Sequence, residues 1–471
     1  MKDERELLRR TAEIAADFLE SLDERPVFPT VPVEGLADAI GGPLPDETCD
    51  PLEVVEHLAR VVEPGVVATA GGRYFGYVTG SALPATIGAD WLTTVWDQCA
   101  GLGVLGPSAS VAEEVVGEWL KELFGLPAHA SFAITTGCQM AHVTALAAAR
   151  HDVLAARSWD VRERGLAGSP PITVVVGRLR HVTVDRALRL LGIGGGQIRV
   201  VEADEQGSMR PDALRAALSA LDGPTIVCAQ AGEVNTGSFD PLREIAEIAR
   251  EKGAWLHVDG AFGLWAAASP TRRHLVDGVD GADSWATDGH KWLNVPYDCG
   301  LAFCARPAAH NASMTMKASY FEGQGRWGRD AVDWTPESSR RARAFTVYAA
   351  LRSLGRQGVA DLVDRCCSHA ERFARAVARL SGCELLNDVV INQVLFRFED
   401  DETTNAVLAH VQASGEAWMG GTVWDGRAAI RVSVSSWRTS ECDIDRTVAA
   451  FEDALAAVER TPAAPQAASD S

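Results

Sequence analysis

The sequence has no long hydrophobic run. No stretch of its 471 residues approaches the roughly 18 consecutive apolar residues that a membrane-spanning helix needs. The opening residues, MKDERELLRR, are charged where a secretion signal would be apolar. We therefore expect a cytoplasmic chain that stays where it is made and has no membrane partner.

Basic residues are few relative to acidic ones. The chain has 44 Lys and Arg against 64 Asp and Glu, which gives a formal net charge of −20. A surface of this sign repels phosphate backbones and anionic lipids. The composition therefore disfavours a protein that binds nucleic acid or a membrane surface.

Cysteine patterns typical of metal sites and disulfide scaffolds are also missing. The ten cysteines include no CxxC pair and no zinc-ligand spacing. Thiols of a long cytosolic chain stay reduced. We therefore expect the cysteines to be small buried hydrophobic residues, and we predict no metal site.

A nucleotide-binding glycine loop is absent as well. The sequence contains no GxxxxGK[ST], and the glycine-rich stretch 192–196 follows a predicted helix and precedes a predicted strand. A dinucleotide fingerprint has the opposite order, strand before helix. We interpret this stretch as a helix C-cap and turn.

The middle of the chain alternates short apolar runs with helical segments. Several runs are continuous Val, Ile, Leu and Ala, as in strands covered by helices on both faces. This alternation is typical of an α/β domain with a mostly parallel sheet. The helices are expected at 138–156, 183–191, 211–221 and 241–252. The seven expected strands are Phe132–Thr135, Ile172–Val176, Ile198–Val201, Thr225–Ala229, Trp255–Val258, Ser284–Ala286 and Leu301–Cys304.

We divide the chain into four parts. Residues 1–70 form a helical arm with little core of its own, which we expect to wrap a second subunit, and residues 71–335 form the large α/β domain. Residues 336–460 form a smaller α+β domain, and the Pro/Ala-rich segment 461–471 is a disordered tail. The expected elements outside the large domain are helices at 1–22, 51–69, 336–380 and 443–459, and strands Glu384–Leu386, Val394–Phe398 and Ala429–Val434.

Three side chains stand where ligands bind in α/β proteins. Asp259 ends a strand, at the edge where such sheets bind ligands, although a turn or helix-capping aspartate would look the same. Lys291 follows the next strand, where burial would lower its pKa and let it attack a carbonyl; the alternative is a surface lysine. His181 lies between a strand and a helix, where it either stacks on a ring or is an ordinary core or surface histidine.

A possible anion site lies at residues 135–139, TTGCQ, which follow a strand and open a long helix. Free backbone amides at a helix N-terminus attract anions. An amine, a carboxylate and a phosphate site are together what pyridoxal phosphate requires. The combination therefore predicts this cofactor.

The same residues carry a family resemblance. The strings TDGHKWLNVPYDCG around Lys291, WLHVDGAFG around Asp259 and RHVTVDRALRLLGI around His181 resemble the group II pyridoxal-phosphate decarboxylases. This family includes the aromatic L-amino-acid, tyrosine, histidine and glutamate decarboxylases. The segments RYFGYVTGSALPATIGADWL, TTGCQMAHVTALAAAR, GEVNTGSFDPL and WTPESSRRARAF also resemble the family in the right order, so the likeness covers residues 50–450.

The resemblance implies the type I aminotransferase fold and an obligate homodimer with shared active sites. It also implies that Lys291 forms a Schiff base with pyridoxal 5'-phosphate, that Asp259 pairs with the pyridine nitrogen, and that His181 stacks on the ring. The other implied site residues are Ala261 against the ring, Gly137, Cys138, Gln139, Asp288 and His290 around the phosphate, and Tyr77 and Thr79 in the substrate pocket.

The implied reaction is decarboxylation of an L-amino acid to the amine and CO2. We see no basic cluster near Tyr77 or residues 99–108, which favours an aromatic or other bulky apolar substrate over an acidic one. The alternatives are a decarboxylating aldehyde synthase, an aminotransferase, or a non-catalytic paralogue that keeps the fold for interaction. The presence of the lysine, aspartate and histidine together argues against the last.

The sequence departs from the family in two places. Animal aromatic decarboxylases carry a tyrosine in a mobile loop, and its replacement goes with aldehyde formation, but residues 321–333 here contain no tyrosine. Glu233 is unusual at its position, and we expect it to face solvent. We also expect Trp91, Trp96 and Trp119 to be core residues because they fall at helical spacing.

Overall fold

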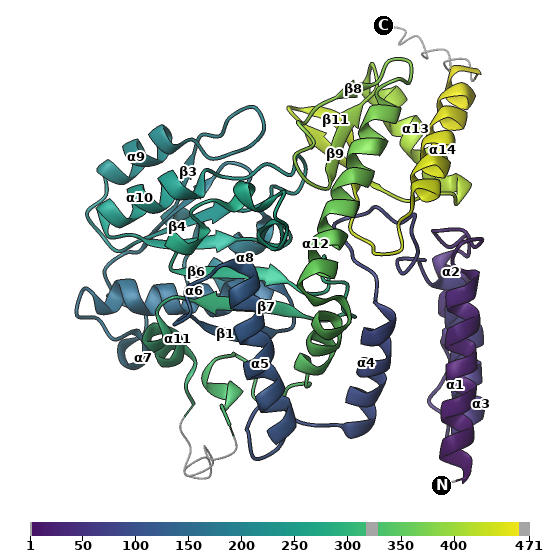
Figure 1. Ribbon diagram of the computed structural model, residues 1–471, viewed down its shortest axis with the longest axis horizontal. Helices are drawn as coiled ribbons and strands as arrows, with labels where there is room; N and C mark the ends of the chain where they lie inside the picture. Colours follow the sequence, from purple (N-terminus) through teal and green to yellow (C-terminus); the bar gives the residue numbers. More distant parts are fainter. Residues whose placement is uncertain (1, 317–327, 461–471) are drawn as a thin grey trace, which may run out of the picture.

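The computed structural model describes residues 2–316 and 328–460 (Figure 1). The expected tail at 461–471 and most of the loop at 321–333 lie outside the described residues. Within the described ranges, no helix is both long enough and apolar enough to span a membrane.

The centre of the molecule is a seven-stranded sheet with the order β1-β7-β6-β5-β4-β2-β3. The pairs β2–β3, β2–β4, β4–β5 and β5–β6 are parallel, and only the pairs made by β7 are antiparallel, which confirms the predicted mostly parallel sheet. Every strand lies within two residues of its expected bounds. The strands are β1 (Ser131–Thr135), β2 (Thr173–Gly177), β3 (Ile198–Val201), β4 (Thr225–Gln230), β5 (Trp255–Asp259), β6 (Ser284–Asp288) and β7 (Gly300–Cys304).

Helices cover both faces of this sheet because successive strand residues point to opposite sides. Val227 and Leu256 join one hydrophobic cluster, with residues of α10, while their neighbours Ile226 and Trp255 join a second cluster, with residues of α6 and α8. The continuous apolar runs noted in the sequence are explained by this double coverage. The helices before and around the sheet are α4 (Pro84–Trp96), α5 (Pro107–Phe124), α6 (Cys138–Ala155), α7 (Val161–Arg164), α8 (Val182–Leu190), α9 (Pro211–Ser219), α10 (Leu242–Lys252) and α11 (Pro307–Met314).

The C-terminal part adds a four-stranded antiparallel sheet with the order β10-β11-β9-β8. The strand β10 was missed from the sequence, because Gly420 and Gly421 have low strand propensity. The Asp425-Gly426 turn that follows, with both residues at positive φ, is the hairpin signal that would have revealed it. These elements are α12 (Ala344–Val377), α13 (Asp401–Ser414), α14 (Glu441–Arg460), β8 (Glu384–Leu385), β9 (Gln393–Arg397), β10 (Gly420–Trp424) and β11 (Arg427–Ser433).

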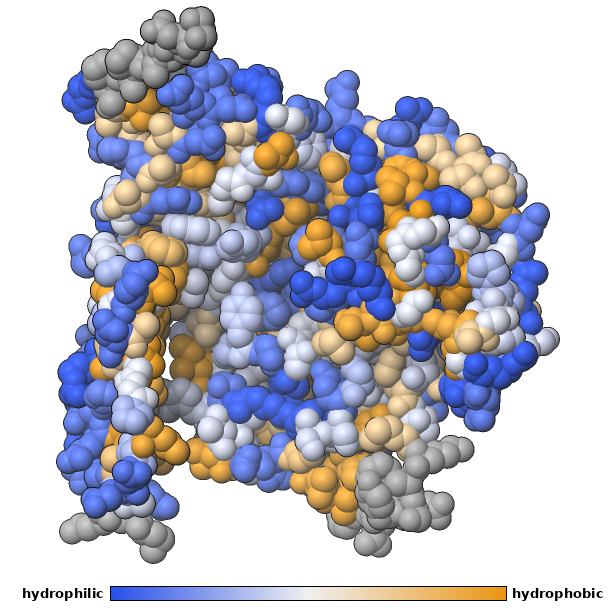
Figure 2. Space-filling model, turned by 180° about the vertical axis from the view of Figure 1, so that it is seen from behind, coloured by the Kyte–Doolittle hydropathy of each residue, from blue (hydrophilic) through white to orange (hydrophobic). Residues whose placement is uncertain are grey.

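The N-terminal helices α1 (Lys2–Ser21), α2 (Val33–Ile40) and α3 (Pro51–Val62) form a column at the side of the molecule (Figure 1). The helix α2 lies in a segment where we expected a linker, and α3 is shorter than expected because Pro64 and Gly65 follow it. Neither α2 nor α3 buries a single residue. Figure 2 shows apolar residues along the side of this column that faces the rest of the chain.

The glycine prediction is confirmed, and the cysteine prediction holds for most of the described cysteines, although Cys49 and Cys442 are exposed. The stretch 192–196 follows the end of α8, and Gly192 has a φ of 80°, which suits a turn after a helix. Six of the ten cysteines are buried.

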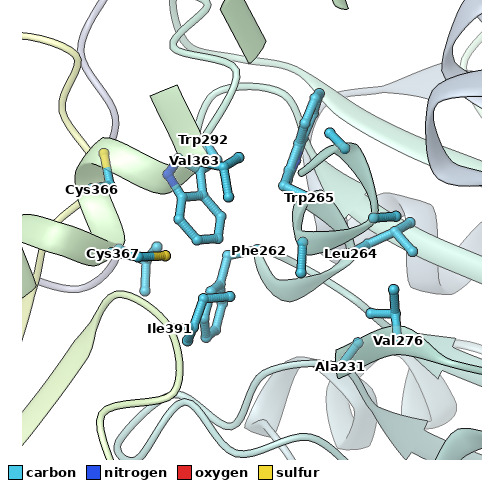
Figure 3. Close-up of a cluster of buried hydrophobic side chains, with 14 of the residues drawn as sticks. Ala231, Phe262, Leu264, Trp265, Val276, Trp292, Val363, Cys366, Cys367 and Ile391 are labelled. Atoms are coloured by element: carbon cyan, nitrogen blue, oxygen red, sulfur yellow. The ribbon is translucent and has the colours of Figure 1, made fainter. Parts of the chain in front are cut away.

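One hydrophobic cluster anchors the loops that follow β5 and β6. Figure 3 shows Phe262 and Trp292 packed side by side, with Val363 of α12 and Ile391 around them. Phe262 lies three residues after Asp259, and Trp292 comes directly after Lys291. This packing therefore fixes the two loops that carry the predicted lysine and aspartate.

Candidate active site

One cavity lies at the carboxyl ends of β5 and β6, beside the N-terminus of α6. Its volume is about 630 Å³. All eleven residues predicted from the sequence to form the site line this cavity: Tyr77, Thr79, Gly137, Cys138, Gln139, His181, Asp259, Ala261, Asp288, His290 and Lys291. Residues far apart in the sequence thus meet at the edge of the sheet where α/β folds bind ligands.

Lys291 forms an ion pair in the cavity. Its Nζ lies 3.0 Å from Oδ2 of Asp288. Burial is the largest single effect and lowers the pKa of Lys291, but the charge and hydrogen bond of Asp288 together with the charge of Asp259 and the neighbouring Cys138 outweigh it, and the net pKa is raised above its ordinary value. Our expectation of a lowered pKa is therefore wrong in this state, because the neighbouring carboxylate stabilises the ammonium form.

The N-terminus of α6 already holds an anionic group. The backbone N–H of Cys138 donates to Oδ1 of Asp288 over 2.6 Å, and Nε2 of His290 lies 3.5 Å from the same oxygen. Gly137 has a φ of 145°, and a Cβ there would meet the His290 ring at 3.4 Å. The predicted anion site thus has the expected chemistry, with a carboxylate of the chain itself bound to it.

Asp259 is buried, with 5% of its surface exposed. Its Oδ1 accepts from the backbone N–H of Ala261 over 3.1 Å, and its Oδ2 lies 3.5 Å from Nε2 of His142. Burial would raise the pKa of Asp259, but His142, His181 and Lys291 outweigh it, and the pKa falls below its ordinary range. The group is therefore a carboxylate at neutral pH.

His181 is the N-cap residue of α8. Its Nδ1 lies 2.7 Å from the hydroxyl of Thr183 and accepts from the backbone N–H of the same residue over 3.4 Å. Burial lowers the pKa of His181. The ring is thus neutral and fixed in the cavity wall by the helix that follows it.

The segment with Tyr77 and Thr79 passes very close to Lys291. A Cβ on Gly80 would lie 1.9 Å from the carbonyl oxygen of Lys291, so only glycine fits there. Tyr77 has a φ of 60° and stacks on Trp418 with the ring centroids 5.9 Å apart. Its side chain is 67% exposed, which leaves it free to contact a ligand or a second chain.

Glu233 does not face solvent, so our expectation for it is wrong. Its carboxylate is buried and accepts hydrogen bonds from the backbone N–H groups of Asn235 and Thr236, both over 2.8 Å. Those donors close the turn after β4. The side chain therefore serves that turn rather than solvent.

The expectation that three tryptophans lie in the core is wrong for two of them. Trp91 is 39% exposed and Trp96 is 50% exposed, while Trp119 is half-buried and stacks on Tyr348. Helical spacing shows that residues share a face, but it does not show what covers that face.

The family model of the pyridoxal-dependent decarboxylase conserved domain matches residues 38–399. The chain belongs to this decarboxylase family. The cofactor of the family is pyridoxal phosphate, and the recognition made from the motifs is confirmed.

The similar proteins span nearly the whole chain. The 4-hydroxyphenylacetaldehyde synthase of Rhodiola rosea is 27% identical over 466 residues, with 93% of each chain covered. The aromatic-L-amino-acid decarboxylase of Mus musculus is 29% identical over 430 residues, with 86% of this chain and 88% of the relative covered. The structure of Oryza sativa TDC with PLP and tryptamine has a TM-score of 0.91 at 22% identity, covering 97% of this chain and 98% of that one, which confirms the type I fold.

The cavity of this decarboxylase fits pyridoxal phosphate. It contains an amine, on Lys291, and a buried carboxylate, on Asp259, together with a helix N-terminus that already binds an anionic group. These are the partners that the aldehyde, the pyridine nitrogen and the phosphate need. The residues of the cavity wall thus match the donor and acceptor groups of the cofactor.

A metal ion is the other group that this wall could hold. Sγ of Cys138, a ring nitrogen of His142 and a carboxylate oxygen of Asp259 lie within 4.8 Å of one another. Burial raises the pKa of the Cys138 thiol well above its ordinary value. Because a metal needs the thiolate, this trio suits the pyridine end of the cofactor better.

Sequence reasoning missed three further residues that face or support the cavity. Arg431 of β11 and Tyr297 line it, and His142 of α6 contacts Asp259. Arg431 is a guanidinium near Tyr77, where we saw no basic cluster. His142 and Tyr297 lie within quoted motifs, which was the available signal for them, whereas Arg431 lies in no quoted motif and reaches the cavity only through the fold.

Proposed function

We propose that this chain removes the α-carboxyl group of an aromatic L-amino acid and releases the amine and CO2. The observation that carries the proposal is that Lys291 and Asp259 line one cavity together with His181. The aromatic substrate is supported by the names of the relatives and by the cavity wall, where Tyr77, Phe262 and Tyr297 offer ring surfaces.

The chain's own groups divide the work as follows. When bound, pyridoxal phosphate supplies an aldehyde for the amino group and a ring that accepts the electron pair left by CO2. Asp259 keeps a proton on the pyridine nitrogen through its negative charge. Lys291 provides the amine that holds the cofactor, and His181 and Ala261 hold the two faces of the ring.

The phosphate lies at the start of α6 in this proposal. Gly137, Cys138 and Gln139 provide the helix N-terminus, and Asp288 and His290 stand beside it. Asp288 must give up its contact with the Cys138 amide when the phosphate arrives. Tyr77 and Thr79 contact the substrate, and Arg431 pairs with its carboxylate before CO2 leaves.

We further propose a homodimer that works in the cytoplasm. Residues 1–70 act as the dimer arm, 71–335 as the cofactor domain and 336–460 as the small domain. The exposed apolar residues of the arm support this assignment, since Val33 is 75% exposed, Leu44 is 91% exposed and Leu58 is 56% exposed. Such surfaces need a covering partner.

The test is a product balance with purified enzyme loaded with pyridoxal phosphate. A panel of L-amino acids is incubated with it, and CO2, amine, aldehyde, ammonia and peroxide are all measured. We expect equal amounts of CO2 and amine from aromatic substrates, and no turnover by the Lys291→Ala variant. Preferred turnover of acidic or small amino acids contradicts the assigned substrate class.

The second candidate is a decarboxylating aldehyde synthase. Two of the relatives carry that activity in their names, and residues 321–333 contain no tyrosine. In the same assay, aldehyde with ammonia and peroxide in place of amine identifies this reaction. A loaded enzyme that is inert toward every amino acid identifies a non-catalytic paralogue.

A further inference from the structure

A row of buried polar side chains leads away from Asp259 into the core. On β5, residues 255, 257 and 259 point to the same face of the sheet, because side chains alternate along a strand. The helix α6 covers that face and brings His142 next to Asp259. The strand β6 contributes Ser284, which is paired in register with His257.

The contacts along this row form one chain. Nδ1 of His142 lies 3.0 Å from Nε2 of His257, and Nδ1 of His257 lies 3.0 Å from the hydroxyl of Ser284. Nε1 of Trp255 donates to the same hydroxyl over 2.9 Å. His142, His257 and Ser284 have no exposed surface. No water can therefore replace these partners, and each ring depends on the next one.

The direction of the chain follows from Asp259, because a carboxylate only accepts. His142 therefore presents a proton on Nε2, which lies 3.5 Å from Oδ2 of Asp259, and its Nδ1 accepts from Nε2 of His257. Nδ1 of His257 then accepts from the hydroxyl of Ser284, whose oxygen accepts from the indole N–H of Trp255.

We infer that His142 is a positioning residue for the cofactor-binding carboxylate, and that His257 and Ser284 set its tautomer. The inference rests on the proposed role of Asp259 at the pyridine nitrogen. Two donors then hold the carboxylate, the Ala261 amide at Oδ1 and the His142 ring at Oδ2. Both stabilise the ionised form and fix the plane of the group.

The charges around Asp259 explain why this matters. His181 and Lys291 also face it across the cavity, while the thiol of Cys138 lies 3.4 Å from Nε2 of His142. Burial lowers the pKa of His257 to about 3, so this ring stays neutral and keeps its tautomer. Without the His142 donor, fewer groups would oppose burial, so the pKa of Asp259 would rise and the proton shared with the pyridine nitrogen would move toward the carboxylate oxygen.

The experiment compares variants that break or keep the donor. His142→Leu removes it, and His142→Gln offers an amide N–H in its place. His257→Leu and Ser284→Ala break the chain further from Asp259. His310→Leu is the matched control, because His310 is equally buried, with 1% exposed, and is hydrogen-bonded to Ser131 and to the Trp334 carbonyl outside this chain.

The decisive measurement is the 15N chemical shift of bound pyridoxal phosphate labelled at its ring nitrogen, together with its dissociation constant. We expect His142→Leu to move the signal toward the unprotonated position and to reduce turnover about tenfold or more, as for a lost hydrogen bond to a charged group. His142→Gln should restore much of both. Ser284→Ala and His257→Leu should shift the signal less, and His310→Leu should not shift it.

The possible outcomes separate this inference from the proposed function. If the wild-type protein binds no pyridoxal phosphate or releases no CO2, the proposed function fails. If the wild-type protein is active but His142→Leu leaves the 15N signal unchanged, only the role of His142 is overturned. If His142→Leu does not fold, Ser284→Ala provides the test, because it is a smaller change. A 15N signal that does not shift in Ser284→Ala contradicts the inferred chain of tautomers.

Discussion

The pair of Lys291 and Asp288 shows how one carboxylate sets the state of the reactive amine. In the proposed function Lys291 would attack the cofactor's aldehyde, and because an ammonium group has no free electron pair, the amine would first have to lose a proton. The raised pKa of Lys291 therefore slows cofactor capture at neutral pH. In the proposed function, Asp288 would keep the amine protonated until a phosphate took its place at the Cys138 amide.

This leads to a pH prediction for Asp288→Asn. Without the carboxylate, burial of Lys291 is opposed by Cys138 and by the charge of Asp259, so the pKa of Lys291 falls. A lost charge at this distance changes a pKa by roughly one to three units. The amine is reactive above its pKa, so the midpoint of the rate of cofactor capture should move to lower pH by that amount. Stopped-flow absorbance of apoprotein mixed with pyridoxal phosphate, at a series of pH values, measures it.

The matched control for this experiment is Asp277→Asn. Asp277 also pairs with a basic residue, Arg243, but both are more than half exposed and neither lines the cavity. The control should leave the capture midpoint unchanged. A midpoint that stays constant in Asp288→Asn, or moves upward, contradicts the electrostatic role of this ion pair.

At the scale of residues, the sequence revealed the groups that directly follow strands. Asp259 could be found because it ends an apolar run, and Lys291 because it follows one. Such runs predict strands, and the end of a strand shows where in the fold the next side chain lies. His142, Tyr297 and Arg431 could not be found in this way. Their importance depends on contacts with other segments. In two of the cases these segments are more than a hundred residues apart, and the contact of His142 with Asp259 is one example.

At the scale of elements, a buried ion pair joins α5, β1 and the segment before α12. Arg340, in the segment before α12, pairs with Glu113 of α5 over 2.6 Å and donates to the carbonyl oxygens of Ala100 and Ile134. Only 5% of Arg340 and 4% of Glu113 is exposed. The guanidinium therefore links α5, β1 and the start of α12.

We predict that Arg340→Leu destabilises the protein strongly. Removing one partner leaves Glu113 buried and unpaired, and such changes reduce the free energy of unfolding by about 3–5 kcal/mol. The double variant with Glu113→Leu should recover part of the loss, because no buried charge remains. Urea denaturation followed by circular dichroism measures all three proteins.

The comparison for this pair is Arg356→Leu. Arg356 pairs with Glu122, but the side chains are 60% and 71% exposed. An exposed pair contributes about 0–1 kcal/mol to the free energy of unfolding. If Arg340→Leu and Arg356→Leu reduce the free energy of unfolding by the same amount, then burial does not make the Arg340–Glu113 pair more important for stability than an exposed pair.

Element positions were predicted well where the pattern was strong and badly where tertiary context decides. The strands of the large sheet are buried on both faces, and such strands appear as uninterrupted apolar runs. The strand β10 is partly exposed and begins with two glycines, so it resembles a loop until β11 pairs with it. The long helix α12 contains a break at Gly355, whose φ of 61° no helical pattern predicts.

At the scale of the whole molecule, one apolar surface is left uncovered by the single chain. A pocket of about 550 Å³ lies between α4, α5 and α12, lined by residues such as Leu92, Trp96 and Phe345. Val95 beside it is 62% exposed. A surface of this kind explains why the tryptophans expected in the core are exposed, since a second copy would bury them.

We therefore predict that Trp96→Asp dissociates the proposed homodimer. Trp96 packs edge-on against Phe345 with the ring centroids 5.4 Å apart, and a carboxylate there would be desolvated in the interface. We expect the variant to sediment as a monomer in analytical ultracentrifugation while the wild type sediments as a dimer. Decarboxylase activity should fall with the dimer, because the proposed homodimer shares its active sites between the two chains. Val200→Asp, on the edge strand β3 at 53% exposure, is the control and should stay dimeric. A wild-type protein that is a fully active monomer contradicts both the arm's role and the shared site, because the uncovered face would then need no partner.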